Sequence, residues 1–177
     1  QKSWQNSPER RADTWPQGNH ITWQFPGNEL TEKDTLQLEW FDGEFYPPKE
    51  IMDLYKDGEY PAESSMLIGT EGALLIPHGK MPVYIPFGTP KEVKLPSLAE
   101  RNHYHHFVDA CLGGEKTESH FAQSGPMAEA VLLGTIAIRV PDQLLTWDSA
   151  KMKFPNYPAA EKFLKRTYRK GWEVKGF

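Results

Sequence analysis

The chain has 177 residues, of which 38% are hydrophobic and 25% are charged, and its formal net charge is -4. This length suits one domain with a substantial core, and the composition is typical of a soluble globular protein rather than a disordered one. Because acidic and basic residues are interspersed, we expect no broad nucleic-acid-binding surface, which needs a basic excess on one face.

A single cysteine excludes both an intramolecular disulfide and a structural zinc site built on two or more cysteines. The longest apolar run, Ala130 to Ile138, is too short to span a bilayer, so we expect no membrane partner. The sequence shows no signal peptide, and both the cytoplasm and the periplasm stay open as the compartment.

Two runs in the first half alternate apolar and polar residues with the period of two that is typical of half-buried strands. Residues 1–18 precede them and predict an irregular arm, because they are polar and rich in turn formers. The first run extends from His20 to Gly27, and the second ends at the turn signal Asp42-Gly43. We expect two adjacent antiparallel strands, whose alternating residues are Ile21, Trp23 and Phe25 and then Leu36, Leu38 and Trp40.

The segments that follow predict further short elements. Residues 47–58 predict a short helix, with proline at its start and Gly58 beyond its end. Residues 65–79 predict a hairpin that turns at Glu71-Gly72, and residues 82–88 predict one more short strand. Strands linked by hairpins favour an antiparallel sheet.

The second half changes to helical spacing. Ser97 and Glu100 have the capping-box spacing, which predicts a helix that begins at Ser97 and ends at Gly113-Gly114. Residues 144–156 predict an extended segment or strand pair, and residues 157–171 predict a final amphipathic helix. Another helix is predicted over 124–140, with a packing stripe formed by Met127, Ala130, Val131, Gly134, Ala137 and Ile138.

These elements predict a single α+β domain over residues 1–177, with an open, mostly antiparallel β-sheet and helices packed on one face. The other face of the sheet, if it is aromatic and exposed, is the expected interface between subunits of a homo-oligomer.

The common catalytic and cofactor motifs are absent from the sequence. It contains no glycine-rich turn for a dinucleotide or a nucleoside triphosphate, no G-x-S-x-G elbow and no H-E-x-x-H zinc helix. We therefore assign no catalytic, cofactor-binding or metal-ligating residue.

Three of the six histidines lie close together, at His103, His105 and His106. On a helix His103 and His106 share a face and His105 points away, so three imidazoles cannot converge on one ion from this helix alone. The commonest arrangement is that one or two such histidines pack where a helix meets a sheet and the others are solvated. The alternatives are substrate contact or a metal site completed from elsewhere. Cys111 is interpreted as a buried structural thiol on the same helix.

Two further features are candidates for ligand binding. Residues 165–172 read KRTYRKGW, which suits an anion or a sugar ring, although a solvated helix end explains the same residues. Trp15, like Trp4, is suited to stack on a carbohydrate, or else to anchor the arm or fill a subunit interface. The candidate substrate-binding residues are therefore Trp15, His103, His106, Tyr168 and Arg169.

Three segments taken in order resemble the C-terminal part of the Gfo/Idh/MocA family of oxidoreductases, and most closely its bacterial branch of sugar-dehydrogenase-like proteins. They are GTEGALLIPHG at 69–79, the stretch at 103–140 that begins HYHHFVDACLGG, and the stretch at 144–174 that begins LLTWDSAKMKFPN. The resemblance implies an N-terminal Rossmann domain that binds NAD or NADP. It also implies a C-terminal α+β domain whose open sheet completes the substrate pocket and commonly mediates oligomerisation.

The family's catalytic D-x-x-x-H pair is absent from this chain. The residues four positions before the six histidines are Pro16, Leu74, Ala99, Arg101, Asn102 and Lys116. The resemblance therefore implies the C-terminal domain alone, without its Rossmann domain and with no cofactor of its own. We expect this domain to bind the substrate and form oligomers within an NAD(P)-dependent oxidoreductase that acts on the CH–OH group of a sugar or polyol, and to be inactive by itself.

Two alternatives belong to other functional classes. One is a stand-alone carbohydrate-binding or scaffolding module. The other is a metal-binding domain centred on His103 and His106.

Overall fold

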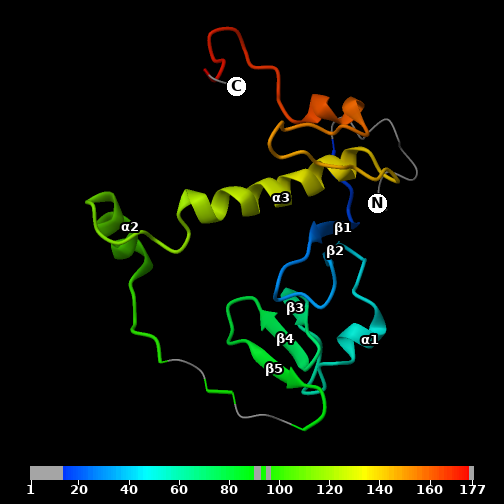
Figure 1. Cartoon of the computed structure of the whole chain (residues 1–177), viewed down its shortest axis with the longest axis vertical. Coiled ribbons are helices and arrows are strands. Elements are labelled where there is room, and N and C mark those ends of the chain that lie inside the picture. Colours follow the sequence, from blue (N-terminus) through cyan, green and yellow to red (C-terminus); the bar gives the residue numbers. More distant parts are fainter. Residues whose placement is uncertain (1–13, 90–92, 95–96, 176–177) are drawn as a thin grey trace. The chain divides into compact units, whose positions relative to one another are not determined.

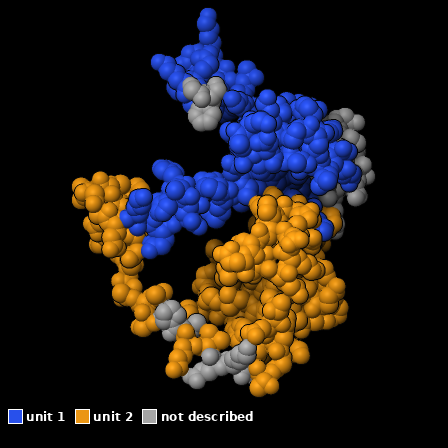
Figure 2. All heavy atoms as spheres, in the orientation of Figure 1, with its two compact units in different colours: residues 1–21, 116–177 blue, residues 22–115 orange. Residues whose placement is uncertain are grey.

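The computed structural model describes residues 14–89, 93–94 and 97–175 and shows a mixed α+β protein, which confirms the predicted fold class (Figure 1). The chain divides into two compact units, which we describe separately (Figure 2). The first unit comprises Gln1–Ile21 and Lys116–Phe177, and the second comprises Thr22–Glu115. Within the predicted arm, residues 1–13, and with them Trp4, lie outside the described residues, and residues 14–18 have no regular structure.

The two strands predicted first are confirmed as β1 (Asn19–Pro26) and β2 (Thr35–Asp42), which form a two-stranded antiparallel sheet. The backbone N–H of Gly27 donates to the carbonyl of Asp34 at 2.7 Å and so closes the connection between them. Residues of β1 alternate between half-buried and exposed, as its period predicts. In β2 the apolar side chains are about half exposed, at 50% for Leu36 and 53% for Trp40.

The predicted hairpin and the strand after it form a separate three-stranded antiparallel sheet. Its strands are β3 (Ser64–Ile68), β4 (Gly72–Pro77) and β5 (Val83–Pro86), with β4 in the centre. Leu75 of β4 pairs with Met66 on one side and with Val83 on the other, and it is fully buried. The strands thus divide between two sheets, whereas the sequence predicted one. The short helix expected over 47–58 is α1 (Lys49–Met52).

Glycine at the start of β4 is required by close packing. A Cβ atom added to Gly72 would lie 2.6 Å from the carbonyl oxygen of Ile85, closer than real contacts allow. Gly72 also accepts a hydrogen bond from the N–H of Gly69 at 2.8 Å, which closes the hairpin turn. The turn signal at Glu71-Gly72 therefore reflects both the turn and the close approach of β5.

Helix α2 (His103–Cys111) begins later than its capping-box pattern predicts. The side-chain oxygen of Asn102 accepts hydrogen bonds from the N–H groups of Tyr104 and His105, both at 3.0 Å. Asn102 is therefore the N-cap, and the predicted start at Ser97 is wrong because residues 97–102 lie outside the helix. The predicted end is confirmed, since Gly113 follows the helix with a φ of 94° that favours glycine.

Helix α3 (Phe121–Arg139) begins before the predicted Ser124, because the N–H groups of Gln123 and Ser124 both donate to the carbonyl of His120 at 2.9 Å. Its buried residues are confined to the C-terminal half and are Gly134, Ile136 and Ile138. The predicted packing stripe is therefore wrong at its N-terminal end, where Met127 and Val131 are exposed.

Helix α3 is long and apolar enough to cross a membrane by length and composition alone, a test that core helices of soluble proteins also pass.

The core of the first unit lies against the C-terminal half of α3. Phe154 and Ala160 are fully buried beside Ile136. Half-buried side chains surround them, from Leu133, Val140, Leu145, Trp147, Tyr157 and Leu164. Residues 144–156 were predicted to form an extended segment or a strand pair. They fold back on themselves at an antiparallel bridge between Asp148 and Lys153, which resembles a strand pair with a single bridge.

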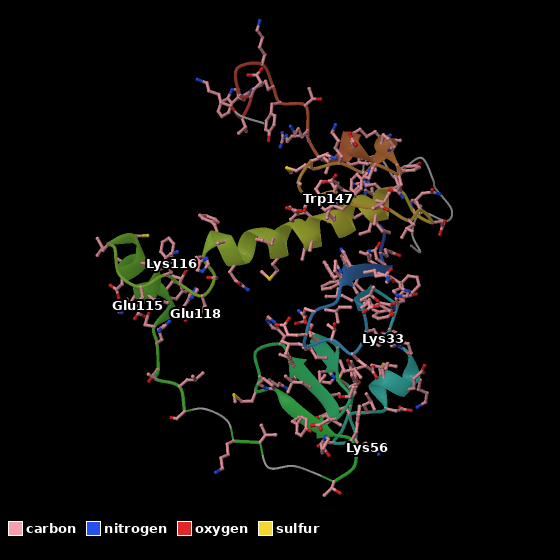
Figure 3. The ribbon with its side chains drawn as sticks, in the orientation of Figure 1. Lys33, Lys56, Glu115, Lys116, Glu118 and Trp147 are labelled. Carbon is pink, nitrogen blue, oxygen red and sulfur yellow. The ribbon has the colours of Figure 1, made fainter. Side chains whose placement is uncertain are left out.

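Two side chains hold this segment in place. Trp147 lies beside α3 (Figure 3). Its indole N–H donates to Oε1 of Glu129 on α3 at 2.7 Å, and its ring lies against Phe154. Asn156 bonds back along the chain, with its amide donating to the carbonyl of Leu144 at 2.7 Å and accepting from the N–H of Thr146 at 2.8 Å.

The final amphipathic helix predicted over 157–171 is wrong beyond its first turns. The structure has a short 3-10 helix, η2 (Pro158–Phe163), and residues 165–168 have no regular structure. Only Ala160 of η2 is buried, and residues 165–175 are all exposed. A helix through this stretch would gain no buried face, and short helices depend on such a face for their stability.

Candidate functional site

The C-terminal segment forms a hollow of about 460 Å³ that is lined by Arg166, Tyr168, Arg169 and Trp172. We call this the arginine–aromatic hollow. It contains two of the predicted substrate-binding residues, Tyr168 and Arg169, and all four lining residues come from the KRTYRKGW stretch.

Each arginine of the hollow lies over an aromatic ring. The guanidinium carbon of Arg166 is 5.2 Å from the centroid of the Tyr168 ring, and that of Arg169 is 4.7 Å from the centroid of the Trp172 ring. Both distances are within the range of a cation–π interaction. An arginine that lies over an aromatic ring can still bind a carboxylate or phosphate through its N–H groups, which form two parallel hydrogen bonds with such an anion.

A tight turn sets the spacing of Arg169 and Trp172. The N–H of Trp172 donates to the carbonyl of Arg169 at 2.9 Å, and Gly171 has a φ of 84°, which favours glycine. The N–H of Gly171 donates to Oε2 of Glu173 at 2.8 Å. Glycine at 171 therefore permits the turn that folds Trp172 back onto Arg169.

The hollow lies in a strongly basic stretch. Between 165 and 175 the basic residues are Lys165, Arg166, Arg169, Lys170 and Lys175, against the single acid Glu173. Among the described residues, no carboxylate forms an ion pair with Arg166 or Arg169. Positive charge at the hollow is therefore not neutralised by the described part of the chain.

Trp15 is the third predicted substrate-binding residue, and the structure places it against the end of α3. The guanidinium carbon of Arg139 lies 3.9 Å from the centroid of the Trp15 ring, and Nη1 of Arg139 donates to the carbonyl of Thr14 at 3.1 Å. This is the arrangement expected of a tryptophan that anchors the arm. Trp15 does not line the hollow, although it remains 57% exposed.

The two predicted histidines, His103 and His106, lie on α2 in the second unit, and neither is among the residues that line the hollow. Nη1 of Arg101 lies 3.3 Å from Nδ1 of His106, and the His103 ring meets Tyr104 edge-on at 5.1 Å between centroids. Within the described ranges, no group of three or more histidine, cysteine, aspartate or glutamate side chains is arranged to hold a metal ion.

Helix α2 exposes an apolar stripe that sequence reasoning missed. All nine of its residues are exposed or half-buried. The helical positions i, i+3, i+4, i+7 and i+8 are taken by Tyr104, Phe107, Val108, Cys111 and Leu112, which we call the α2 stripe. The interpretation of Cys111 as a buried thiol is wrong, because this stripe faces solvent and Cys111 is exposed.

Arg166 and Trp172 lie in the KRTYRKGW stretch that the sequence marked as suited to an anion or a sugar ring, but they were not among the five named candidate residues. The signal for both was present, since arginine and aromatic residues two or three positions apart can stack wherever the backbone turns. The helix predicted over 157–171 obscured this pattern, because on a helix these side chains would have had different neighbours. Comparisons with protein-family models, with curated proteins and with solved structures found no match to this chain.

Proposed function

We propose that this chain is the substrate-binding and oligomerisation domain of an NAD(P)-dependent oxidoreductase that acts on the CH–OH group of a sugar or polyol. The ordered resemblance of residues 69–79, 103–140 and 144–174 to the Gfo/Idh/MocA family supports this proposal, as does the α+β fold class. The proposal places the catalytic D-x-x-x-H pair and the cofactor in a Rossmann domain of the same protein.

The observation that carries the proposal is the extent of apolar surface that the chain leaves exposed. Tyr104 and Leu112 of the α2 stripe are 77% and 81% exposed, and Leu36, Leu38 and Trp40 of β2 are each about half exposed. Exposed apolar patches on two elements are typical of surfaces that further protein covers. A cofactor domain and a second subunit are the two coverings that the proposed function requires.

This chain's own residues do not fit a dinucleotide. A Rossmann site needs parallel strands joined by a helix and a glycine-rich turn, but both described sheets are antiparallel and the sequence has no such turn. In the proposed enzyme the nicotinamide accepts or donates the hydride. We therefore assign no chemical step to these residues, which contribute substrate contacts and subunit contacts only.

A nicotinamide-linked assay tests the proposal. The purified chain is incubated with NAD⁺ or NADP⁺ and a panel of sugars and polyols, beside the protein in which this domain is joined to its Rossmann domain. We expect reduced nicotinamide to accumulate only with the joined protein. Turnover by the chain alone, or none by the joined protein with any member of the panel, would contradict the proposal.

A stand-alone carbohydrate-binding module is the second candidate, and the arginine–aromatic hollow is the observation that favours it. Sugar binding by the isolated chain fits both candidates, so the nicotinamide assay on the joined protein is what separates them. A metal-binding role for His103 and His106 is tested separately, by elemental analysis of protein purified without a polyhistidine tag.

A further inference from the structure

We propose that the arginine–aromatic hollow binds an acidic monosaccharide, either a uronate or a sugar phosphate. The inference rests on the proposed function for the sugar part of the ligand and names its chemical class. The ligand's anionic group pairs with the N–H edges of Arg166 and Arg169, and its ring stacks on Trp172.

The size of the hollow suits such a ligand. Small-molecule sites in proteins measure roughly 300–1,000 Å³, and this hollow measures about 460 Å³. A single sugar ring with one charged substituent is small enough to enter it.

The charges around the hollow indicate that its ligand carries an anionic group. Arg166 and Arg169 have aromatic partners but, among the described residues, no carboxylate partner. The one acid between 165 and 175, Glu173, accepts a hydrogen bond from the backbone of Gly171. Both guanidinium groups line the same hollow, and a carboxylate or phosphate bound there would offset their positive charge and supply the acceptors that guanidinium N–H groups prefer.

The exposed aromatic surface indicates that the ligand also carries a ring that can stack. Trp172 is 67% exposed although Arg169 lies over its ring, so part of its apolar surface faces solvent. The C–H face of a pyranose is apolar and its hydroxyl groups are polar, so a sugar can cover an aromatic ring without losing hydration at its edge. An inorganic anion would use the arginines but leave this surface uncovered.

A nucleic acid strand would also combine charge with a stacking base. The chain as a whole argues against it, because its formal net charge is -4 and the basic stretch covers only about the last eleven residues described. Strand binding depends on a basic track along several nucleotides. We therefore assign the hollow to a small acidic sugar.

The test is a titration of the complete 177-residue chain with each probe, in which binding is measured by calorimetry and by tryptophan fluorescence. The probes are glucuronate, glucose 6-phosphate, glucose, inorganic phosphate and a single-stranded oligothymidylate. We expect glucuronate or glucose 6-phosphate to bind about tenfold more tightly than either glucose or inorganic phosphate, because only these two acidic sugars use both the arginines and the ring. Raising the salt concentration should weaken their binding.

Matched variants assign the binding to the hollow. The double variant Arg166→Gln/Arg169→Gln removes two positive charges from the lining, and Lys165→Gln/Lys170→Gln removes two from neighbouring positions outside it. We expect the first to bind the acidic sugar about tenfold more weakly and the second to bind within about twofold of the parent chain. Trp172→Leu should weaken sugar phosphate more than inorganic phosphate. All variants are checked for an unchanged circular dichroism spectrum.

Several outcomes would overturn the inference: no binding of either acidic sugar, equal binding of glucose, equal losses in the two double variants, or tighter binding of the oligothymidylate. Equal binding of inorganic phosphate would also overturn it, because the hollow would then be a simple anion site. None of these results bears on the nicotinamide assay, which uses the joined protein. The ligand proposed for the hollow can therefore be wrong while the oxidoreductase proposal is right, and the oxidoreductase proposal can be wrong while the hollow still binds an acidic sugar.

Discussion

Arg139 at the end of α3 stacks on Trp15, with its guanidinium carbon 3.9 Å from the centroid of the indole ring. The same arginine donates to the carbonyl of Thr14, so one side chain contacts both the ring and the backbone of the arm. These contacts join residues far apart in the sequence. They hold Trp15 against α3 although residues 14–18 have no regular secondary structure.

Removing either partner of this pair should destabilise the first unit modestly. We expect a double-mutant cycle of Trp15→Leu and Arg139→Gln to give a coupling energy of about 0.5–1 kcal/mol, the size of a partly exposed cation–π interaction. The measurement is urea unfolding followed by tryptophan fluorescence. A coupling energy indistinguishable from zero would mean that the ring and the guanidinium do not stabilise each other.

Phe154 should be the residue whose truncation most destabilises the first unit, because it is 1% exposed and lies in the cluster with Ile136 and Ala160. Phe154→Ala should cost about 3–5 kcal/mol in the free energy of unfolding. The control is the same substitution at Phe121, which is 93% exposed, and it should change stability by no more than about 0.5 kcal/mol. Similar urea midpoints for the two variants would be inconsistent with this core.

Helix α2 should depend on Asn102 and not on Ser97. The Asn102 side chain accepts two backbone hydrogen bonds at 3.0 Å, whereas Ser97 is exposed and lies outside the helix. Asn102→Ala should destabilise the helix by about 1 kcal/mol and speed amide hydrogen exchange of His106 to Cys111 several-fold. Ser97→Ala should leave that exchange unchanged. Faster exchange in the Ser97 variant would support the capping box instead.

The proposed oligomer should depend on the apolar side chains of β2. Leu38 is 47% exposed, and neighbouring residues on a strand point to opposite faces, so Gln37 lies on the other face. We expect Leu38→Lys to shift the protein to a monomer in light scattering after gel filtration, because a lysine in an apolar interface loses its hydration. Gln37→Lys adds the same charge and should leave the oligomer intact. If the oligomer kept its mass in both variants, the interface would not involve this face of β2.

Local patterns in the sequence determined much of the secondary structure. The alternation of Ile21, Trp23 and Phe25 predicted β1, and the Glu71-Gly72 turn predicted the hairpin of β3 and β4. Gly113 marked the end of α2 correctly. These features depend on side chains and backbone angles within a few residues of each other, so the order of residues is enough to specify them.

Boundaries that depend on competing partners were not predicted. Ser97 and Asn102 both carry a capping side chain, and the sequence offers no means of choosing between them. Likewise, the residues after η2 have helical propensity, but whether a helix forms there depends on a buried face that only the packed structure provides or withholds.

The site shows the same division. The sequence identified Tyr168 and Arg169 as candidates from their chemistry, and the contact of Arg169 with Trp172 is also local, because it forms through the turn at Gly171. Tertiary structure decided that Trp15 meets Arg139, a contact between residues more than a hundred positions apart. A contact of this kind forms only when distant segments of the chain come together in the folded protein, so residue order by itself does not specify it.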